Sequence, residues 1–170
     1  VFTRDVAGSP SANWTRRARL LASDSTVGNA FGGSVAIDSD TIAVGAIGTF
    51  QEPSHRGLAM PRPSTDHGSA YIFTRDVAGI LTASWTECAK LLASDGAADD
   101  AFGTSLALSA DTVVVGAIGD DDKGSYSGSA YIFTRDIAGS LTASWTQRAK
   151  LIASDGALGD HFGSVAISGD

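Results

Sequence analysis

The order of apolar and polar residues along the chain predicts short β-strands. Residues 105–118 predict two strands joined by a tight turn, and the second is almost continuously apolar, as expected of a strand buried on both faces. Residues 128–136 predict a third strand, whose alternation places Tyr131 and Phe133 on the same face. Apolar residues do not recur at the three-and-four spacing of an amphipathic helix. The pattern therefore indicates an all-β fold.

The same pattern occurs three times along the chain. Each copy has a tryptophan 17 residues before a Phe-Gly pair, and these pairs begin at Phe31, Phe102 and Phe162. The first two pairs are 71 residues apart and the last two 60. Such self-similarity indicates one supersecondary unit repeated in tandem, with each copy burying its apolar face against the next. Four antiparallel strands in each copy predict the blades of a β-propeller, with a β-sandwich as the alternative.

A fourth strand in each copy begins at the tryptophan and is clearest over residues 85–94. Strand alternation predicts four apolar residues on one of its faces: Trp85, Ala89, Leu91 and Ala93. The opposite face is predicted to carry Thr86, Cys88, Lys90 and Ser94. Cys88 is the only cysteine and aligns with Arg17 and Arg148 of the other copies. We therefore expect its side chain to face solvent and not to act as a catalytic thiol.

The repeat boundaries predict a propeller that is incomplete within residues 1–170. The repeat pieces cover approximately residues 1–30, 31–101, 102–161 and 162–170, which supply about eleven strands and about three blades. A closed propeller needs at least about four blades, and an open arc leaves edge strands and apolar flanks exposed. We therefore expect the chain to belong to a larger polypeptide, or to be completed by another copy or a partner chain.

Two short motifs resemble a known repeat. Phe31-Gly32 and Phe102-Gly103 are each followed, 14 residues after the Phe, by the glycine of a Val-Gly-Ala run. This arrangement resembles the FG-GAP repeat, which builds the seven-bladed propeller of integrin α subunits and similar propellers in bacterial, algal and fungal proteins. The resemblance implies that each Phe packs between neighbouring blades, and that the glycines let backbones approach closely.

The sequence departs from the integrin pattern in three places. Ile47 and Ile118 stand where the family motif has proline, and the third copy is one residue shorter than the other two. The link between the two halves of the motif is only a tight turn, 38–40 in one copy and 109–111 in another. This link is too short for the calcium-binding loop of integrin blades, so that calcium site is not implied here.

Composition narrows the class of partner. With 43% hydrophobic and 18% charged residues, the chain is expected to fold rather than to remain disordered. Its net charge of −7 and its lack of a basic cluster disfavour nucleic acid as a partner. It has no apolar run of about 18 residues, so we predict no membrane span.

The strongest polar cluster lies in residues 119–127 and contains Asp120, Asp121 and Asp122. Calcium takes about six to eight oxygen ligands, so consecutive carboxylates with nearby carbonyl groups predict a calcium site, the only cofactor that we expect. The alternative is an unliganded acidic turn. A second acidic segment, 95–100, recurs in the third copy, which favours aspartates that accept backbone N–H bonds where the chain crosses between blades.

Residues 49–67 form the least repetitive segment and account for the longer spacing between the first two copies. Loops that depart from a rigid repeated scaffold often carry the specific function, so we predict a partner-binding loop. The alternative is a tolerated insertion without a role. The candidate contact residues are Phe50, His55, Arg56, Met60 and Arg62.

The remaining motifs give little support for catalysis. We find no nucleophile elbow, zinc-binding motif or phosphate-binding glycine loop, and therefore predict that the protein is not an enzyme. Asn13-Trp14-Thr15 is a formal glycosylation sequon, which predicts a modified Asn13 in a secretory protein, although short matches of this kind also arise by chance.

Together these features predict a non-catalytic binding or adhesion propeller that is extracellular or exported. It would recognise protein or glycan ligands through the loops at the ends of its blades, a prediction that depends on the family resemblance, because fold alone does not fix function. One alternative is a lectin with sugar sites between blades. Another is a structural subunit that docks on a larger assembly through residues 49–67.

Overall fold

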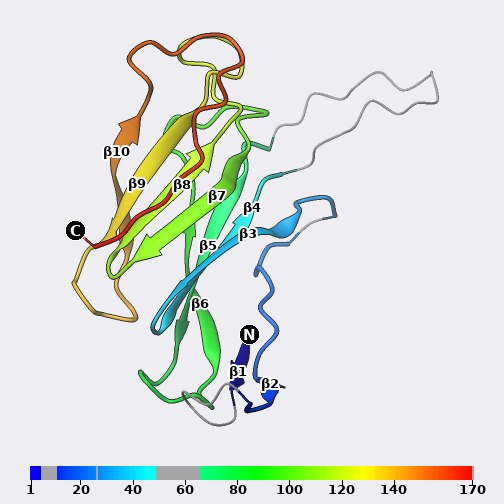
Figure 1. The fold of residues 1–170 in the computed structure, drawn as a ribbon, viewed down its shortest axis with the longest axis vertical. Helices are drawn as coiled ribbons and strands as arrows, with labels where there is room; N and C mark the ends of the chain where they lie inside the picture. Colours follow the sequence, from blue (N-terminus) through cyan, green and yellow to red (C-terminus); the bar gives the residue numbers. More distant parts are fainter. Residues whose placement is uncertain (5–10, 26, 49–65, 170) are drawn as a thin grey trace, which may run out of the picture.

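The computed structural model describes residues 1–4, 11–25, 27–48 and 66–169, and within them the protein is all-β (Figure 1). Two strands form a small sheet, β1 (Phe2–Arg4) and β2 (Trp14–Arg16). The first blade consists of β3 (Phe31–Asp38), β4 (Thr41–Ala46), β5 (Ser69–Arg75) and β6 (Trp85–Leu91). The second blade consists of β7 (Phe102–Ser109), β8 (Thr112–Ala117), β9 (Ser129–Arg135) and β10 (Trp145–Leu151).

Within each sheet, strands that follow one another in the sequence pair in antiparallel fashion, as the repeat predicted. The small sheet corresponds to the outer half of a preceding blade, because β1 and β2 pair as β5 pairs with β6. In each of the three sheets an arginine lies opposite the tryptophan that begins the last strand, and its guanidinium stacks on the indole 4.9–5.1 Å from the ring centroid. These pairs are Arg4–Trp14, Arg75–Trp85 and Arg135–Trp145.

A β-bulge changes which residues share a face in β6, so the predicted alternation of this strand was wrong. Glu87 pairs with Phe73 and Ala89 with Ile72, which leaves Cys88 as the extra residue. Beyond the bulge the pleat is inverted, and Trp85 therefore packs with the core on one side of the blade while Ala89 packs on the other. A bulge occurs at the equivalent place in β10.

The bulge also corrects the prediction for Cys88. The side chain does not face solvent freely, because it is half-buried and packs against the core between the two blades. Burial raises the pKa of the Cys88 thiol, which keeps it protonated at neutral pH. In the third copy, Arg148 at this position reaches out to Thr134 and Asp136 instead. Alignment with an arginine was therefore a poor guide to exposure.

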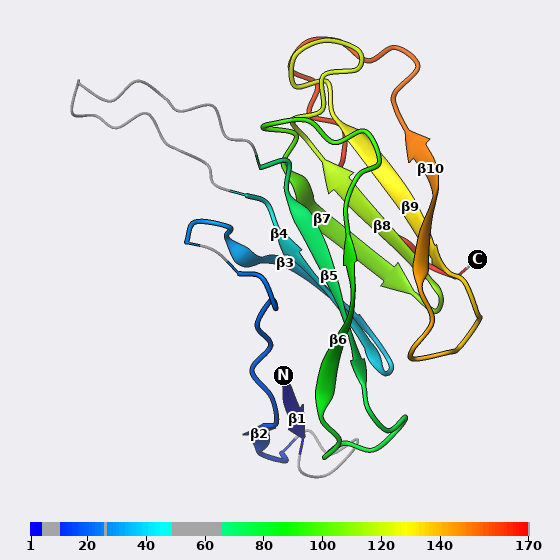
Figure 2. The same ribbon diagram turned by 180° about the vertical axis from the view of Figure 1, so that it is seen from behind.

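The main core lies between the two blades, where β3 and β4 lie beside β7 (Figures 1 and 2). Phe102 is fully buried there and makes edge-to-face contacts with Tyr131 and Phe133, with ring centroids 5.4 and 6.0 Å apart. It packs with Ile72 and Leu91 of the first blade. The expected position of this Phe between neighbouring blades is confirmed.

A hydrogen bond from a serine side chain to a glycine carbonyl joins each blade to the repeat that follows it. The Ser34 hydroxyl of β3 donates a 2.6 Å hydrogen bond to the Gly103 carbonyl of the second blade, and Ser105 donates to the Gly163 carbonyl in the same way. Gly45 and Gly116 make this approach possible, since a Cβ on either would lie about 2 Å from that carbonyl oxygen. The serine–glycine stitch, as we call this contact, thus recurs at both joints.

The third copy does not form the eleventh strand that the repeat predicted. Within the described residues, 163–169 form no ladder, and Phe162 makes only an isolated bridge with Gly128. The equivalent strand β7 owes its ladder to β8, and no such partner strand follows Phe162 in the chain described. No helix in the described part of the chain is long and apolar enough to cross a membrane.

Candidate functional site

Connections between strands gather at the two ends of the blades. At one end, the crossing end, lie the segments that lead from blade to blade (residues 92–101 and 152–161) and the β8–β9 connection (residues 118–128). At the other, the hairpin end, lie the tight turns between β3 and β4 and between β7 and β8. Polar side chains cluster at both ends.

A carboxylate–lysine cluster occupies the crossing end, formed by Asp95, Asp120, Asp122 and Lys150. The three carboxylates each provide an oxygen within 4.8 Å of the others, close enough to hold a metal ion. The Lys150 ammonium lies among them, 2.8 Å from Asp95 and 2.7 Å from each of the other two. The Tyr131 hydroxyl lies 3.0 Å from a carboxylate oxygen of both Asp95 and Asp120, which share its single donor. Lys150 and Tyr131 of the second blade thus bind Asp95, which lies in the segment that leaves the first blade after β6.

The electrostatics of this cluster follow from its pairing. Burial pushes the pKa of Asp120 upward, but hydrogen bonds from Lys150 and other donors outweigh it, so the pKa lies below its ordinary value. The same balance lowers the pKa of Asp95. Burial works against charge on Lys150 as well, yet its carboxylate partners raise the pKa of the ammonium. Asp95, Asp120 and Lys150 are therefore charged at neutral pH.

The cluster differs in membership from the predicted calcium site. Asp120 and Asp122 do converge, but Asp121 lies apart and accepts a 2.7 Å hydrogen bond from the Tyr126 amide within its own turn. Asp95 and Lys150 were not predicted from the sequence as members of this site. Asp95 lies in the connection between β6 and β7, and Lys150 lies on β10. A usable signal was present: Asp24 and Lys90 hold the same places in the preceding copy and lie 2.6 Å apart.

Asp100 is a buried carboxylate beside this cluster and accepts a 2.7 Å hydrogen bond from the Ala97 amide. Burial raises its pKa, and the charge of Asp120 adds to the effect. Because the charged form is disfavoured in the fold, this group weakens the folded state at neutral pH, and the penalty disappears as the pH falls below its unfolded-state value.

We therefore expect Asp100→Asn to stabilise the protein by about 1 kcal/mol at pH 7. The amide oxygen keeps the bond from Ala97, and Asn29 already occupies this position in the first copy. Urea unfolding at pH 7 and pH 4 measures the difference, which should shrink at the lower pH. Asp160→Asn is the matched control, since the exposed Asp160 accepts the same bond from the Ala157 amide and should show no gain. Equal effects of both substitutions would contradict this account.

A polar groove of about 210 Å³ lies between the blades at the hairpin end. Three carboxylates line it, those of Asp38, Asp40 and Asp111, together with Arg135. Asp38 accepts the Ala110 amide of the next blade at 2.7 Å, which lowers its pKa. Arg135 pairs with Asp111 at 2.9 Å and donates to Thr41 of the first blade at 2.8 Å. These contacts hold the groups in place, so the groove presents a fixed acidic surface.

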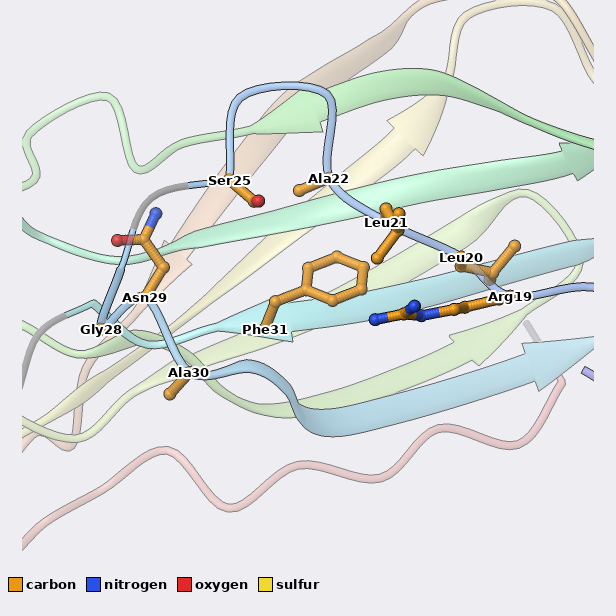
Figure 3. A pocket seen from close by; sticks show the side chains of 9 residues that line it. All are labelled: Arg19, Leu20, Leu21, Ala22, Ser25, Gly28, Asn29, Ala30 and Phe31. Carbon is orange, nitrogen blue, oxygen red and sulfur yellow. The ribbon is translucent and has the colours of Figure 1, made fainter.

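A larger hollow of about 380 Å³ lies at the first crossing, between residues 19–22 and the start of β3 (Figure 3). Figure 3 shows the Phe31 ring below this segment, with Arg19 and Leu21 directed towards it. At the second crossing the equivalent space is closed, because the Phe102 amide bonds to the His67 carbonyl at 2.9 Å and Gly68 lies against Phe102. The residues that precede β5 therefore occupy, at the second crossing, the space that is hollow at the first.

Other predicted site residues lie elsewhere. The five candidate contacts of the partner loop fall outside the described residues: Phe50, His55, Arg56, Met60 and Arg62. Asn13 is exposed immediately before β2, and β2 lies at the side of the molecule away from the second blade (Figure 1).

Comparison with known proteins agrees with the repeat seen in the structure. Residues 14–73, 85–133 and 145–170 each match the FG-GAP repeat. Each match begins at a tryptophan that opens the last strand of a blade, and together they cover most of the chain. No curated protein gives a significant match.

Proposed function

Because the chain belongs to the FG-GAP repeat family, we propose that it is part of a non-catalytic binding and adhesion propeller. Its ligands are proteins or glycans, bound by the loops at the ends of the blades. The observation that supports this proposal is the contrast between scaffold and loops. The two blades use the same strand register and the same serine–glycine stitch, whereas the Asp-rich connection 118–128 differs in length and sequence from residues 47–68, the equivalent connection of the first blade.

The groove at the hairpin end favours a glycan or a basic peptide segment as ligand. Its carboxylates are held by backbone amides and by arginines, so they present acceptor oxygens without rearrangement. Sugar hydroxyls and cationic side chains are the groups that such oxygens bind. This supports the lectin alternative, in which the site lies between two blades.

Binding assays separate the two ligand classes. We expect the chain to bind either a glycan array, with competition by a defined monosaccharide, or immobilised extracellular proteins measured by interferometry. Asp38→Asn should weaken binding about tenfold if the groove carries it, since it removes a charge without changing the side-chain volume. Asp160→Asn at the other end serves as control. A folded chain that binds neither class contradicts the proposal.

The flanks of the two blades support a further blade on each side. Val35 and Ile37 of β3 are 65% and 61% exposed, although Ile42 and Val44, their partners on β4, are buried and pack with Val1 and Leu20. Beyond the second blade, Ile152, Leu158 and Phe162 are also exposed. The joint between the two complete blades indicates the occupant, namely another blade of the same repeat.

Light scattering over a range of protein concentrations tests whether another blade packs on these flanks. We expect the 170-residue chain to associate through these flanks, and Ile37→Lys to reduce association because it puts a charge on the apolar flank. Val77→Lys, which changes an exposed residue in the β5–β6 turn, should leave association unchanged. A well-ordered monomer at all concentrations contradicts the proposal.

An adhesion role would require the protein to lie outside the cell or in an exported compartment, and we propose that location for it. In that setting Asn13 is a candidate for N-glycosylation, since it is exposed and lies two residues before Thr15. A mass decrease after glycosidase treatment, absent in Asn13→Gln, tests this; an unmodified Asn13 in secreted material counts against it.

A further inference from the structure

The carboxylate–lysine cluster at the crossing end has the oxygens of a metal site but already contains a cation. The Lys150 ammonium has three N–H donors, and three different carboxylates lie within hydrogen-bond distance of it. No donor of this ammonium is left over. A divalent ion at the same point would meet the ammonium at contact distance, and the two charges would repel each other.

We propose that Lys150 is the resident cation of this cluster, and that it orders the β8–β9 connection where a calcium ion would otherwise be needed. Lys150 comes from β10, Asp95 from the crossing that leaves the first blade, and Asp120 and Asp122 from the β8–β9 connection. One ammonium therefore ties three separate segments together. A cation–π contact adds to this arrangement, because the Lys150 ammonium also lies 5.4 Å from the Tyr131 ring centroid.

The rest of the connection is organised around the most buried of the three carboxylates, that of Asp120. The Asp120 side chain is 4% exposed, and one of its oxygens accepts the Asp122 amide at 3.2 Å. Its carbonyl accepts the Gly128 amide at 2.8 Å and the Ser127 hydroxyl at 3.1 Å. Fixing Asp120 thus fixes both ends of the turn without a metal.

The preceding copy supplies a matched comparison. Lys90 holds the equivalent position on β6 but pairs with one described carboxylate, that of Asp24, at 2.6 Å. Arg19 stands at this position in the first copy. The position therefore carries a cation in all three copies, whereas the three-carboxylate cluster is found, among the described residues, only around Lys150.

Thermal unfolding of Lys150→Met, Lys150→Arg and Lys90→Met, with and without millimolar calcium, tests the proposal. We expect the wild-type melting temperature to move by less than about 1 °C with calcium, and Lys150→Met to melt about 5–10 °C lower, because its carboxylates lose their cation. Calcium should recover several degrees in Lys150→Met by occupying the vacated point, and nothing in Lys90→Met. Lys150→Arg should stay near wild type and remain insensitive to calcium.

Terbium luminescence keeps the proposal testable if Lys150→Met does not fold, because Tyr131 is close enough to sensitise an ion in the cluster. The wild-type chain should give no sensitised emission. Emission from wild type that disappears in Asp122→Asn would overturn the proposal and restore calcium as the occupant. A Lys150→Met variant as stable as wild type would overturn it equally.

Discussion

Phe102→Ala is expected to lower the free energy of unfolding by about 3–5 kcal/mol. The ring is fully buried between the two blades, where it contacts Tyr131, Phe133 and the apolar face of the first blade. Its removal leaves a cavity that β-strands on both sides cannot easily close, because each is held in register by its own ladder. Urea unfolding followed by tryptophan fluorescence measures the loss.

The repeat provides the control for this substitution within the same chain. Phe162 occupies the same motif position but is 39% exposed, since no complete blade follows it in the described residues. Phe162→Ala should therefore cost about 1 kcal/mol or less. Equal losses at the two positions would show that burial between blades is not what makes Phe102 important.

Gly45→Ala is expected to cost about 3 kcal/mol, although it adds a single methyl group. A Cβ at this position would lie 2.1 Å from the Gly103 carbonyl oxygen and 2.2 Å from the Ser34 hydroxyl. The serine–glycine stitch would have to open, and the second blade would have to move away from the first. Thermal unfolding measures the loss, which should be accompanied by loss of cooperativity between the blades.

A glycine with open surroundings separates this steric effect from backbone strain. Gly79 has a φ of +71° and nothing within 4 Å of an added Cβ. Gly79→Ala should therefore cost only the strain of a left-handed alanine, about 1 kcal/mol. Were Gly79→Ala the more damaging of the two, the close approach at Gly45 would not be the controlling contact.

The fold could be predicted from the sequence because its information is local. Strand alternation, the buried run 112–118 and the repeated Phe-Gly pair each report on one blade or on one joint, and the ladders and the burial of Phe102 agree with them. The face of β6 was not predictable in this way. The bulge at Cys88 adds one residue to the strand, and nothing in the alternation of residues 85–91 indicates where the period is broken.

The candidate site was harder to predict from the sequence, because its residues come together only when the blades pack against each other. Consecutive aspartates suggested one cluster within the turn, but a turn points neighbouring side chains in different directions, so Asp121 separates from Asp120 and Asp122. Asp95 and Lys150 are 55 residues apart and join through the blade-to-blade contact. The recurrence of a lysine opposite an aspartate in the preceding copy was the one sequence signal for this pairing.

The serine–glycine stitch joins nearest neighbours only, Ser34 to Gly103 and Ser105 to Gly163. Insertion of one more blade would therefore add one such contact and leave the existing contacts in place. The free energy of unfolding should then grow by a similar amount with each blade added. Unequal recombination between such units would change the circumference of the ring without redesigning any surface. The number of blades can thus change during evolution without changes to the blade surfaces, while the loops change in sequence independently.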